Sequence, residues 1–413
     1  MDQAATDKLY VTTYFARQPI LDADQNVWAY RLLYREVEGC GGEPCDADQQ
    51  ALDLLCESLL HQGRGASGAV QRVAIPFPAE AVSGVASLSL PTGSIVPVID
   101  AEDTGDDLLD DLRALKAEGY ALALSGYTGQ PAAEALLPFM DVVFVPVGRD
   151  EARTEEALRR ILANDATPAA MDVDTRERFN TAKALGFSLF LGRFFQRPEV
   201  VSGRRLSTNI VTKLQLSRMM LDEDTDFSEL AATIQADVSV SYRLLTLINS
   251  AAFGYKDIDS IERAVVLLGW EKLKNWVYLV VLTDIQPKGK SSELPYLSTI
   301  RAKFLESAAQ SHGVADPKPQ SLFLLGLFSL LDAMLDQTMD EVVAQLPLDD
   351  AISQALAGAD NELAPWLALA RCFETGDWNR LDELVERLGL DATRTAGAYF
   401  EAIGWTKSFF QYD

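Results

Sequence analysis

Histidine and cysteine are scarce in this chain of 413 residues, which contains two histidines and four cysteines. A metal centre built from several imidazoles is therefore excluded, because His61 and His312 are the whole supply. Cys40, Cys45 and Cys56 precede His61, but their C-x4-C-x10-C-x4-H spacing is irregular for a zinc site. We expect free thiols here, with a structural zinc site as the weaker alternative.

Long basic runs and long apolar runs are also missing. The formal net charge is -25, and the richest basic stretch, Arg193 to Arg205, has only four arginines in thirteen residues. Nucleic-acid binding needs a basic surface to neutralise phosphates, so we expect no direct nucleic-acid partner. The longest apolar stretches, Trp276–Thr283 and Leu322–Leu331, are shorter than the ~20 residues of a membrane span. Without a signal peptide, the chain is expected to be a soluble, cytoplasmic protein with no membrane insertion.

Strand patterns alternate with helical patterns from Tyr10 to about Phe195. This alternation predicts parallel pairing, and about eight strands over this length favour a (β/α) barrel for residues 1–200. Six apolar runs read as strands: Val73–Phe77, Ser94–Val98, Ala121–Ser125, Asp141–Val145, Ala166–Met171 and Phe187–Leu191. The intervening helices are expected at Ala47–His61, Gly105–Glu118, Thr154–Ala163 and Thr175–Leu185.

After residue 200 helical periodicity continues to the end of the chain, which predicts an all-helical domain over residues 201–413. The polar stretch Gln286–Pro295 is expected to be an exposed loop, Asn249 to end a helix, and His312 to lie at a helix C-terminus rather than to bind a metal. The predicted helices are Leu206–Met220, Asp226–Gln235, Ser239–Ser250, Ile261–Leu268, Glu271–Thr283, Thr299–Ser311, Leu322–Asp336, Met339–Leu346, Leu348–Ala357 and Trp378–Leu388.

Acidic residues are few at the carboxyl ends of the predicted strands, where a barrel places its chemistry. A two-metal centre needs several converging carboxylates to offset about four positive charges. We expect solvated loop acids rather than a single-metal site. The acids near this rim are Asp100, Glu102, Asp103, Asp172 and Asp174.

Two stretches resemble known bacterial domains. Phe15–Asp22, followed by Val27–Arg35, resembles the start of EAL domains, which are (β/α) barrels that in many cases hydrolyse cyclic di-GMP with two divalent metals. Leu244–Gly254, followed by Ile258–Gly269, is similar to HDOD domains, which are helical relatives of the HD phosphohydrolases. The order of the two, together with Gly326–Ala333, is similar to the bacterial EAL–HDOD tandem proteins. The fold class implied is α/β followed by all-α, namely a degenerate EAL-like barrel and then an HDOD domain.

The resemblance places other residues at the family's metal-ligand and catalytic positions. Arg31, a cation, takes the place of the first glutamate, and Ser329 and Leu330 take the place of the His-Asp pair of HD enzymes. The remaining barrel positions hold Pro76, Pro97, Asp100, Ser125, Gly126, Phe144, Met171, Asp174 and Leu191.

These replacements predict no metal, no cofactor and no catalytic residue. We expect a non-enzymatic regulator that acts through unidentified signalling proteins, and the resemblance also allows a homodimer. The alternative is a sensor that binds a cyclic dinucleotide without cutting it, through a vestigial pocket formed by Gln18, Leu33 and Arg35, where Arg35 pairs with a phosphate. The third possibility, an enzyme acting on a phosphate ester, has the weakest support in the sequence.

Overall fold

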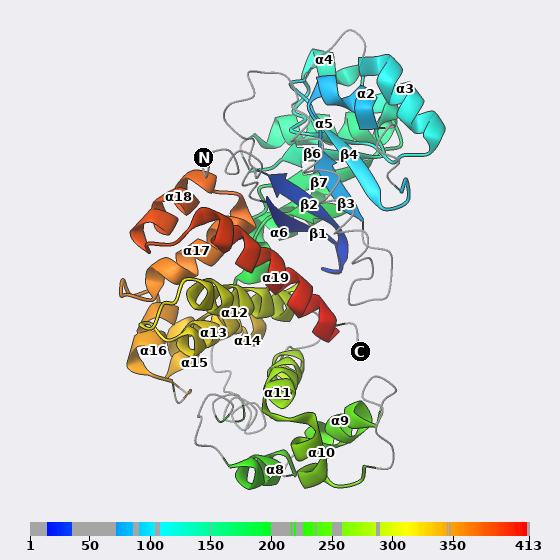
Figure 1. The fold of residues 1–413 in the computed structure, drawn as a ribbon. Helices are drawn as coiled ribbons and strands as arrows, with labels where there is room; N and C mark the ends of the chain where they lie inside the picture. The colour runs from blue at the N-terminus through cyan, green and yellow to red at the C-terminus, as the bar shows by residue number, and fades with distance from the viewer. Residues whose placement is uncertain are drawn as a thin grey trace, which may run out of the picture.

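Eight strands close into a barrel in chain order, and a helical region follows (Figure 1). This confirms the predicted fold class. The structure, a computed structural model, describes residues 15–34, 72–85, 91–103, 108–148, 150–199, 226–235, 238–249, 258–285, 290–344 and 348–410, with single positions at 216, 219 and 346. The strands are β1 (Phe15–Asp22), β2 (Val27–Tyr34), β3 (Val73–Pro76), β4 (Ile95–Asp100), β5 (Ala123–Ser125), β6 (Val142–Pro146), β7 (Thr167–Met171) and β8 (Leu189–Leu191).

The first two strands depart from the predicted parallel pairing. β1 pairs with β2 and with β8 in antiparallel orientation, and the other neighbours from β2 to β8 are parallel. Only Ala23–Asn26 separate β1 from β2, and a segment this short cannot make the crossover that parallel strands need. A hairpin therefore opens the barrel, and no helix lies between its two strands to cover their outer face.

Short helices cover the rest of the barrel. Asp150 and Thr175 cap α5 and α6 by accepting hydrogen bonds from the backbone N–H groups of Arg153 and Arg178. Three of the predicted helices, Gly105–Glu118, Thr154–Ala163 and Thr175–Leu185, are confirmed as α3, α5 and α6, with α5 beginning three residues earlier than expected. The elements are η1 (Ala79–Ala81), α2 (Val82–Val85), α3 (Leu108–Glu118), α4 (Pro131–Glu134), η3 (Leu137–Phe139), α5 (Glu151–Ala163), α6 (Arg176–Leu185) and η4 (Phe194–Gln196).

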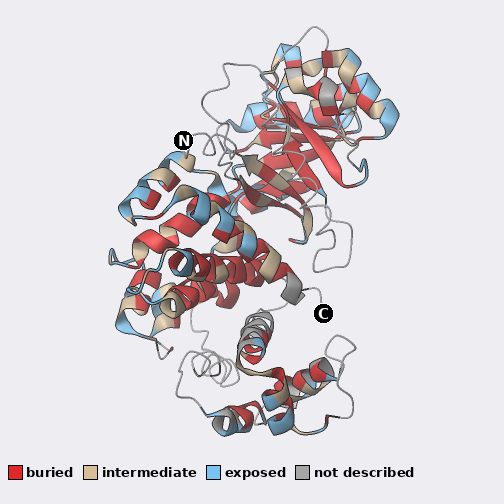
Figure 2. Ribbon diagram, viewed as in Figure 1, coloured by how far each residue is buried: buried red, intermediate tan, exposed pale blue. Residues whose placement is uncertain are grey.

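Two hydrophobic clusters hold the chain together. The smaller one fills the barrel interior and is formed by alternate strand residues, as the period of two requires: Ile20, Ala29, Ala74, Val96, Val98, Ala123, Val142, Phe144, Ala169, Leu189 and Leu191. The larger cluster surrounds the barrel. It contains the outward-facing strand residues and continues into the helical region. Figure 2 shows this buried layer running through both parts of the molecule.

The helical region departs from prediction in three places. Two helices were not predicted, α17 and α19; α12 begins at Glu293 rather than at Thr299; and the predicted Leu322–Asp336 helix breaks into α13 and α14. The elements are α8 (Phe227–Gln235), α9 (Val238–Ile248), α10 (Ile261–Leu268), α11 (Trp270–Ile285), α12 (Glu293–Ser311), α13 (Pro319–Phe328), α14 (Leu331–Leu335), α15 (Met339–Val343), α16 (Asp350–Leu356), α17 (Ala364–Thr375), α18 (Trp378–Arg387) and α19 (Ala392–Phe410).

The early start of α12 overturns the expected exposed loop Gln286–Pro295 at its end, while residues 286–289 lie outside the described residues. Glu293, Leu294 and Pro295 are buried helical residues. A proline is tolerated in the first turn of a helix, where its missing N–H would lack a partner in any case. Gly326 explains how α13 packs so closely on this helix, since a Cβ there would lie 2.4 Å from the backbone nitrogen of Ala302.

The helices α12, α17 and α19 cover the outer face of the β1–β2 hairpin (Figure 1). Tyr30 and Leu32, which point outward from β2, are 5% and 1% exposed. The aromatic rings of the three helices pack together behind this face, with Phe373 stacked on Tyr399 at a centroid distance of 4.3 Å. The helical region thus supplies the cover that the hairpin lacks.

Some sequence-based expectations fall outside the described residues. These are the helices Ala47–His61 and Leu206–Met220, and the segment with Cys40, Cys45, Cys56 and His61. The predicted boundary between residues 200 and 201 also lies at the edge of a segment that is not described and stays a prediction. Among the helices that are described, none combines the length and the apolar character needed to cross a membrane.

Candidate functional site

The carboxyl ends of the strands form the barrel mouth. Continuing the inward alternation of the interior cluster by one step places a polar or charged side chain inward on three strands: Arg31 on β2, Asp100 on β4 and Ser125 on β5. Pro76, Phe144, Met171 and Leu191 also share the inward side, as the sequence predicted. Pro97 does not, because its neighbours Ile95 and Ile99 belong to the outer cluster.

Arg31 is the cation of this mouth. Burial lowers the pKa of its guanidinium, and the charges of Asp100 and Asp172 act in the opposite direction. Its Nε is buried and has no hydrogen-bond partner among the residues that the structure describes. A cation with an unused donor, placed between carboxylates at the end of a barrel, suits an anionic ligand.

Asp100 and Asp172 are the carboxylates that face Arg31. The Asp100 Oδ1 accepts a hydrogen bond of 2.9 Å from the backbone N–H of Glu102, which fixes the side chain at the strand end. Gly126 lies opposite, and a Cβ there would be 3.9 Å from both Asp100 oxygens. Asp172 is exposed, and its backbone has a positive φ of 61° directly after β7.

Asp174, unlike Asp100 and Asp172, forms an ion pair with a neighbouring arginine side chain among the residues that the structure describes. Its Oδ1 accepts a hydrogen bond of 3.0 Å from the backbone N–H of Arg193, and its Oδ2 lies 3.3 Å from an Arg193 guanidinium nitrogen. Burial alone raises the pKa of Asp174, but the hydrogen bonds from Arg193 outweigh it and hold the pKa below its ordinary value. Asp174 therefore neutralises a neighbouring arginine.

The part of the mouth that the structure describes does not fit a centre of two divalent metals. Nowhere in the described ranges do three or more histidine, cysteine, aspartate or glutamate side chains come together in a way that could hold a metal ion. Two carboxylates with an arginine between them offset little positive charge, and such a centre needs several converging acids.

The residues predicted for a vestigial nucleotide pocket are only partly brought together. Gln18 lies beside Arg31 in the β1–β2 ladder. The Leu33 side chain packs against the helical region, where a Cβ at Gly376 would lie 3.1 Å from it. Arg35 lies outside the described residues. Their role in nucleotide binding stays a prediction.

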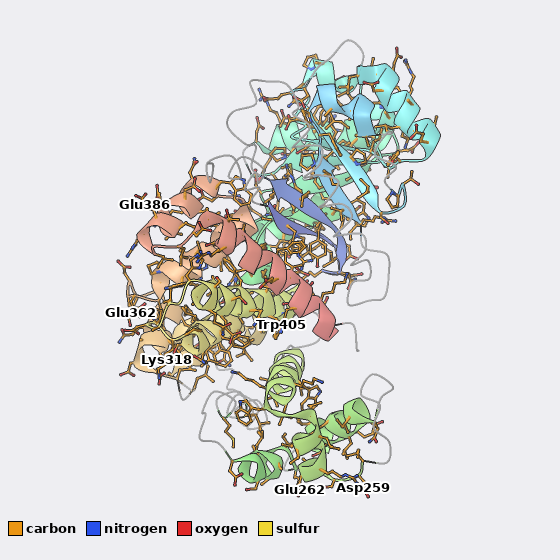
Figure 3. The ribbon with its side chains drawn as sticks, in the orientation of Figure 1. Asp259, Glu262, Lys318, Glu362, Glu386 and Trp405 are labelled. Carbon is orange, nitrogen blue, oxygen red and sulfur yellow. The ribbon has the colours of Figure 1, made fainter. Side chains whose placement is uncertain are left out.

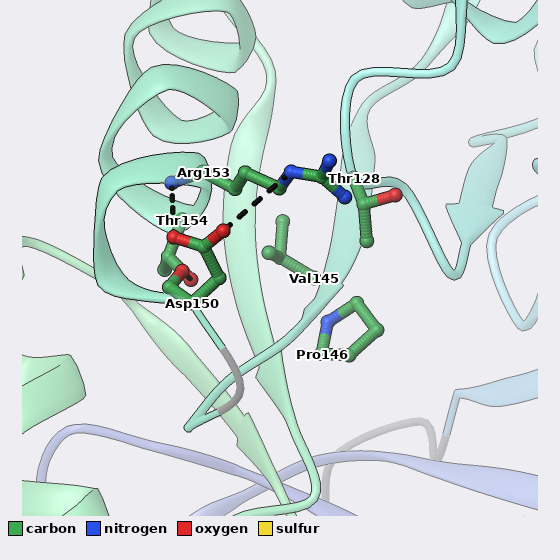
Figure 4. A pocket seen from close by; sticks show the side chains of 6 residues that line it. All are labelled: Thr128, Val145, Pro146, Asp150, Arg153 and Thr154. Atoms are coloured by element: carbon green, nitrogen blue, oxygen red, sulfur yellow. Dashed lines mark hydrogen bonds and ion pairs between the residues drawn. The ribbon is translucent and has the colours of Figure 1, made fainter.

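A separate cavity of about 230 Å³ lies beside the mouth, at the end of β6 and the start of α5 (Figure 4). Thr128, Val145 and Pro146 form one side, and Asp150, Arg153 and Thr154 form the other. Asp150 already caps α5 and pairs with the Arg153 side chain at 3.5 Å. The two charged side chains that line the cavity, Asp150 and Arg153, therefore neutralise each other.

In the helical region the expected structural roles are confirmed. Asn249 ends α9, donating hydrogen bonds to the carbonyl groups of Leu245 and Ile258 and accepting one from the Ile258 N–H. His312 caps α12 at its C-terminus, and its Nε2 accepts a hydrogen bond of 2.8 Å from the Asp391 N–H. Ser329 accepts a hydrogen bond of 2.8 Å from the Arg301 guanidinium.

Sequence reasoning missed Glu293, which is buried at the contact between the barrel and the helices. Its carboxylate oxygen accepts a hydrogen bond of 2.5 Å from the Tyr30 hydroxyl, across 263 residues of sequence. The surrounding Lys288–Glu293 segment is polar and carries no signal of burial. Only the tertiary contact reveals it.

Comparisons with known proteins agree with this architecture. Residues 207–347 match the HDOD domain family. The chain is 34% identical to the cyclic di-GMP phosphodiesterase CdgJ of Vibrio cholerae, over 98% of this chain and 94% of that protein. It is 31% identical to YuxH of Bacillus subtilis, over 95% of this chain and 97% of that protein.

Solved structures with a similar barrel have lower sequence identity to the chain and cover less of it. A standalone EAL protein of Vibrio cholerae, in its c-di-GMP bound form, has 18% identity and a TM-score of 0.33, covering 44% of this chain and 89% of that one. The EAL domain of DcpA from Mycobacterium smegmatis has 17% identity and a TM-score of 0.36, covering 44% and 90%.

One of these comparisons corrects the sequence-based expectation about function. A non-enzymatic regulator, or a sensor without hydrolysis, was predicted from the replaced ligand positions. That prediction is wrong, because a relative matched over nearly its whole length is named as a phosphodiesterase. Residues that differ from a family's expected ligands do not by themselves exclude an enzyme.

Proposed function

Because the chain belongs to the bacterial EAL–HDOD tandem proteins, we propose that it is a phosphodiesterase that opens cyclic di-GMP at its barrel mouth. The observation that carries the proposal is the 34% identity to a Vibrio cholerae protein of that name over 98% of the chain. Such a match includes both the barrel and the helical region, so it relates the whole architecture and not one domain alone.

The mouth offers groups for this chemistry without a metal cluster. Hydrolysis forms a bond between a water oxygen and phosphorus, breaks one phosphorus–oxygen ester bond, takes a proton from the attacking water, and delivers a proton to the leaving ester oxygen, which becomes a hydroxyl group. We assign Arg31 to the phosphodiester, whose negative charge its guanidinium offsets through charge-assisted hydrogen bonds. We assign Asp100 to accept the proton from the water, because its carboxylate is fixed at the strand end.

The test is hydrolysis of cyclic di-GMP by the purified full-length chain, with the linear product separated by chromatography. Reactions contain Mg²⁺, Mn²⁺ or Ca²⁺, or a chelator. We expect linear dinucleotide to accumulate with the enzyme concentration. Arg31→Ala and Asp100→Asn should each lower kcat/KM by about tenfold to a hundredfold, as expected for hydrogen bonds that involve a charged group.

Asp259→Asn is the matched control, since it removes one exposed carboxylate in the helical region, far along the chain from the mouth (Figure 3). It should leave kcat/KM unchanged. Absence of linear product under every metal condition, from protein shown to be folded by circular dichroism, contradicts the proposal. An equal loss of kcat/KM in Asp259→Asn and Asp100→Asn contradicts the assignment of catalysis to the barrel mouth.

A further inference from the structure

A cluster of polar and charged side chains is buried where the β1–β2 hairpin meets the helices. It takes one or more members from each element in contact: Arg17 from β1, Tyr30 from β2, Glu293 and Tyr296 from α12, Glu374 from α17, and Tyr399 and Lys407 from α19. Each of these residues is at most 9% exposed. Such groups are costly to bury, so their mutual contacts decide how the two parts of the molecule sit together.

The hydrogen bond from Tyr30 to Glu293 is the direct polar link in this cluster. At 2.5 Å it is short, and Glu293 is 3% exposed at the start of α12. Burial raises the pKa of Glu293 to about 7, with Glu374 acting in the same direction, while Arg17 and the Tyr30 hydrogen bond act against the shift. The carboxyl group therefore changes charge near neutral pH.

Arg17 supports the same link from β1. Its guanidinium lies 4.3 Å from the centre of the Tyr30 ring and 4.6 Å from that of Tyr296, so it stacks between the hairpin and α12. Lys407 on α19 adds a second cation, and burial lowers its pKa to about 8, helped by repulsion from Arg17. The interface thus holds two cations, of which Arg17 acts directly on the Glu293 carboxyl group.

The strand β2 connects this cluster to the mouth. Successive strand residues point to opposite faces, so Tyr30 points outward to Glu293 while Arg31 points inward to Asp100 and Asp172. The two residues share one peptide bond. A change in how firmly Tyr30 is held therefore reaches Arg31 directly.

We propose that Glu293 is a positioning residue: by accepting the hydrogen bond of Tyr30 it fixes β2, and with it the Arg31 guanidinium that binds the phosphate. This rests on the proposed function only for the part that concerns substrate. In this buried site ionisation of Glu293 opposes folding, since its pKa is raised above the ordinary value, so β2 is held more firmly below neutral pH than above it. The helical region thereby sets the geometry of the barrel mouth.

The test compares Glu293→Gln and Tyr30→Phe with the wild type in the full-length protein. Gln keeps the size of Glu293 and cannot ionise, and Phe removes the hydroxyl but keeps the ring that stacks on Arg17. Hydrogen exchange of β2 is measured by mass spectrometry at pH 6 and pH 8, as protection factors corrected for intrinsic rates. At pH 6 we expect Tyr30→Phe to lose about threefold to tenfold in β2 protection, as for one lost hydrogen bond. At pH 6 Glu293→Gln should resemble the wild type, because its amide oxygen still accepts the bond, and at pH 8 it should be better protected than the wild type, whose Glu293 has ionised.

Glu306→Gln is the matched control, because Glu306 lies on the same helix and pairs at 2.9 Å with Lys303 rather than with the barrel. Its β2 protection should equal that of the wild type at both pH values. A general loss of stability would lower protection throughout the chain, whereas loss of positioning lowers it in β2 alone. Equal β2 protection of Tyr30→Phe and the wild type at pH 6 overturns the proposal.

A second measurement follows cyclic di-GMP turnover. In Tyr30→Phe at pH 6 we expect KM to rise by about threefold to tenfold with kcat nearly unchanged, since the contact to Arg31 acts on binding. An unchanged KM at pH 6 argues against the link to Arg31. If the wild type shows no turnover at all, the proposed function fails, and the exchange experiment still decides whether Glu293 positions β2.

Discussion

The side chains of Arg301 and Glu374 form a buried two-point ion pair between α12 and α17. The Arg301 Nε lies 2.5 Å from one Glu374 oxygen, and a terminal guanidinium nitrogen lies 2.7 Å from the other. Gln196, which follows β8 at the barrel mouth, accepts a further hydrogen bond of 3.2 Å from Arg301. The pair therefore joins two helices and the end of the barrel at one point.

Breaking this pair should be costly. Glu374→Gln leaves the Arg301 charge buried without its partner, and we expect the free energy of unfolding to fall by about 3–5 kcal/mol. Urea unfolding followed by circular dichroism measures the change. Glu383→Gln, which removes the carboxylate of an exposed pair with Arg380, should change it by less than about 1 kcal/mol. If the free energy of unfolding falls by similar amounts in the two variants, burial does not determine how much an ion pair stabilises this protein.

The pH dependence of stability follows from Glu293. Its pKa is raised by burial to about 7 in the folded protein, so the folded state binds more protons than the unfolded state between the two pKa values. Its contribution is fully present below pH 4.5, the ordinary pKa, and is lost as the pH rises through about 7. We expect the stability of the wild type, relative to Glu293→Gln, to fall from pH 5 to pH 8. Urea midpoints at four pH values and constant ionic strength measure it, and a difference that does not change with pH contradicts the assignment.

Close packing between the mouth and the helical region predicts a specific effect at Gly376. This residue ends α17 with a φ of 68°, and an added Cβ would lie 3.1 Å from the Leu33 side chain. Gly389, with a φ of 66° and nothing within 4 Å, is the matched control. Both Gly→Ala changes carry a backbone cost of about 1 kcal/mol, but Gly376→Ala should cost more because of the Leu33 contact.

Thermal unfolding of the two alanine variants measures that difference. In a Leu33→Ala background the extra cost at Gly376 should disappear, because the smaller side chain removes the clash. An excess cost that persists without the Leu33 side chain would mean that the clash lies elsewhere.

The barrel should not be stable by itself. Without α12, α17 and α19 the outer face of the β1–β2 hairpin, including Tyr30 and Leu32, is open to water. We expect a fragment of residues 1–200 to aggregate or to lack cooperative unfolding, whereas the full chain folds. Size-exclusion chromatography and thermal unfolding compare them. A monomeric fragment with the thermal midpoint of the full chain contradicts this expectation.

Much of the fold could be predicted from the sequence, because its signals are local. Buried strands such as β6 and β7 appear as apolar runs, and α10 has the predicted bounds because its apolar residues recur three and four apart. Helices α17 and α19 were missed. Each begins in a segment rich in alanine and small residues, and its buried face is defined by partners far away in the chain.

The candidate site was harder to predict, because it depends on which side of a strand each residue faces. Alternation from the interior cluster places Arg31 inward and Pro97 outward, and both assignments need the observed pairing. Glu293 gave no signal at all, since its neighbours in sequence are polar. Its burial arises from a contact with a strand 263 residues earlier. Function was also misjudged, because missing ligands were taken to mean missing catalysis.

The uncovered hairpin at the start of the barrel has a consequence for biosynthesis. A ribosome adds about 5–20 residues per second, so the partners of Tyr30, which begin 263 residues later at Glu293, emerge on the order of 10–50 seconds after it. During that interval the newborn chain exposes an apolar strand face and an open edge. We expect chaperones that shield nascent chains to bind this hairpin, because helices that leave the ribosome later complete strands that left it earlier.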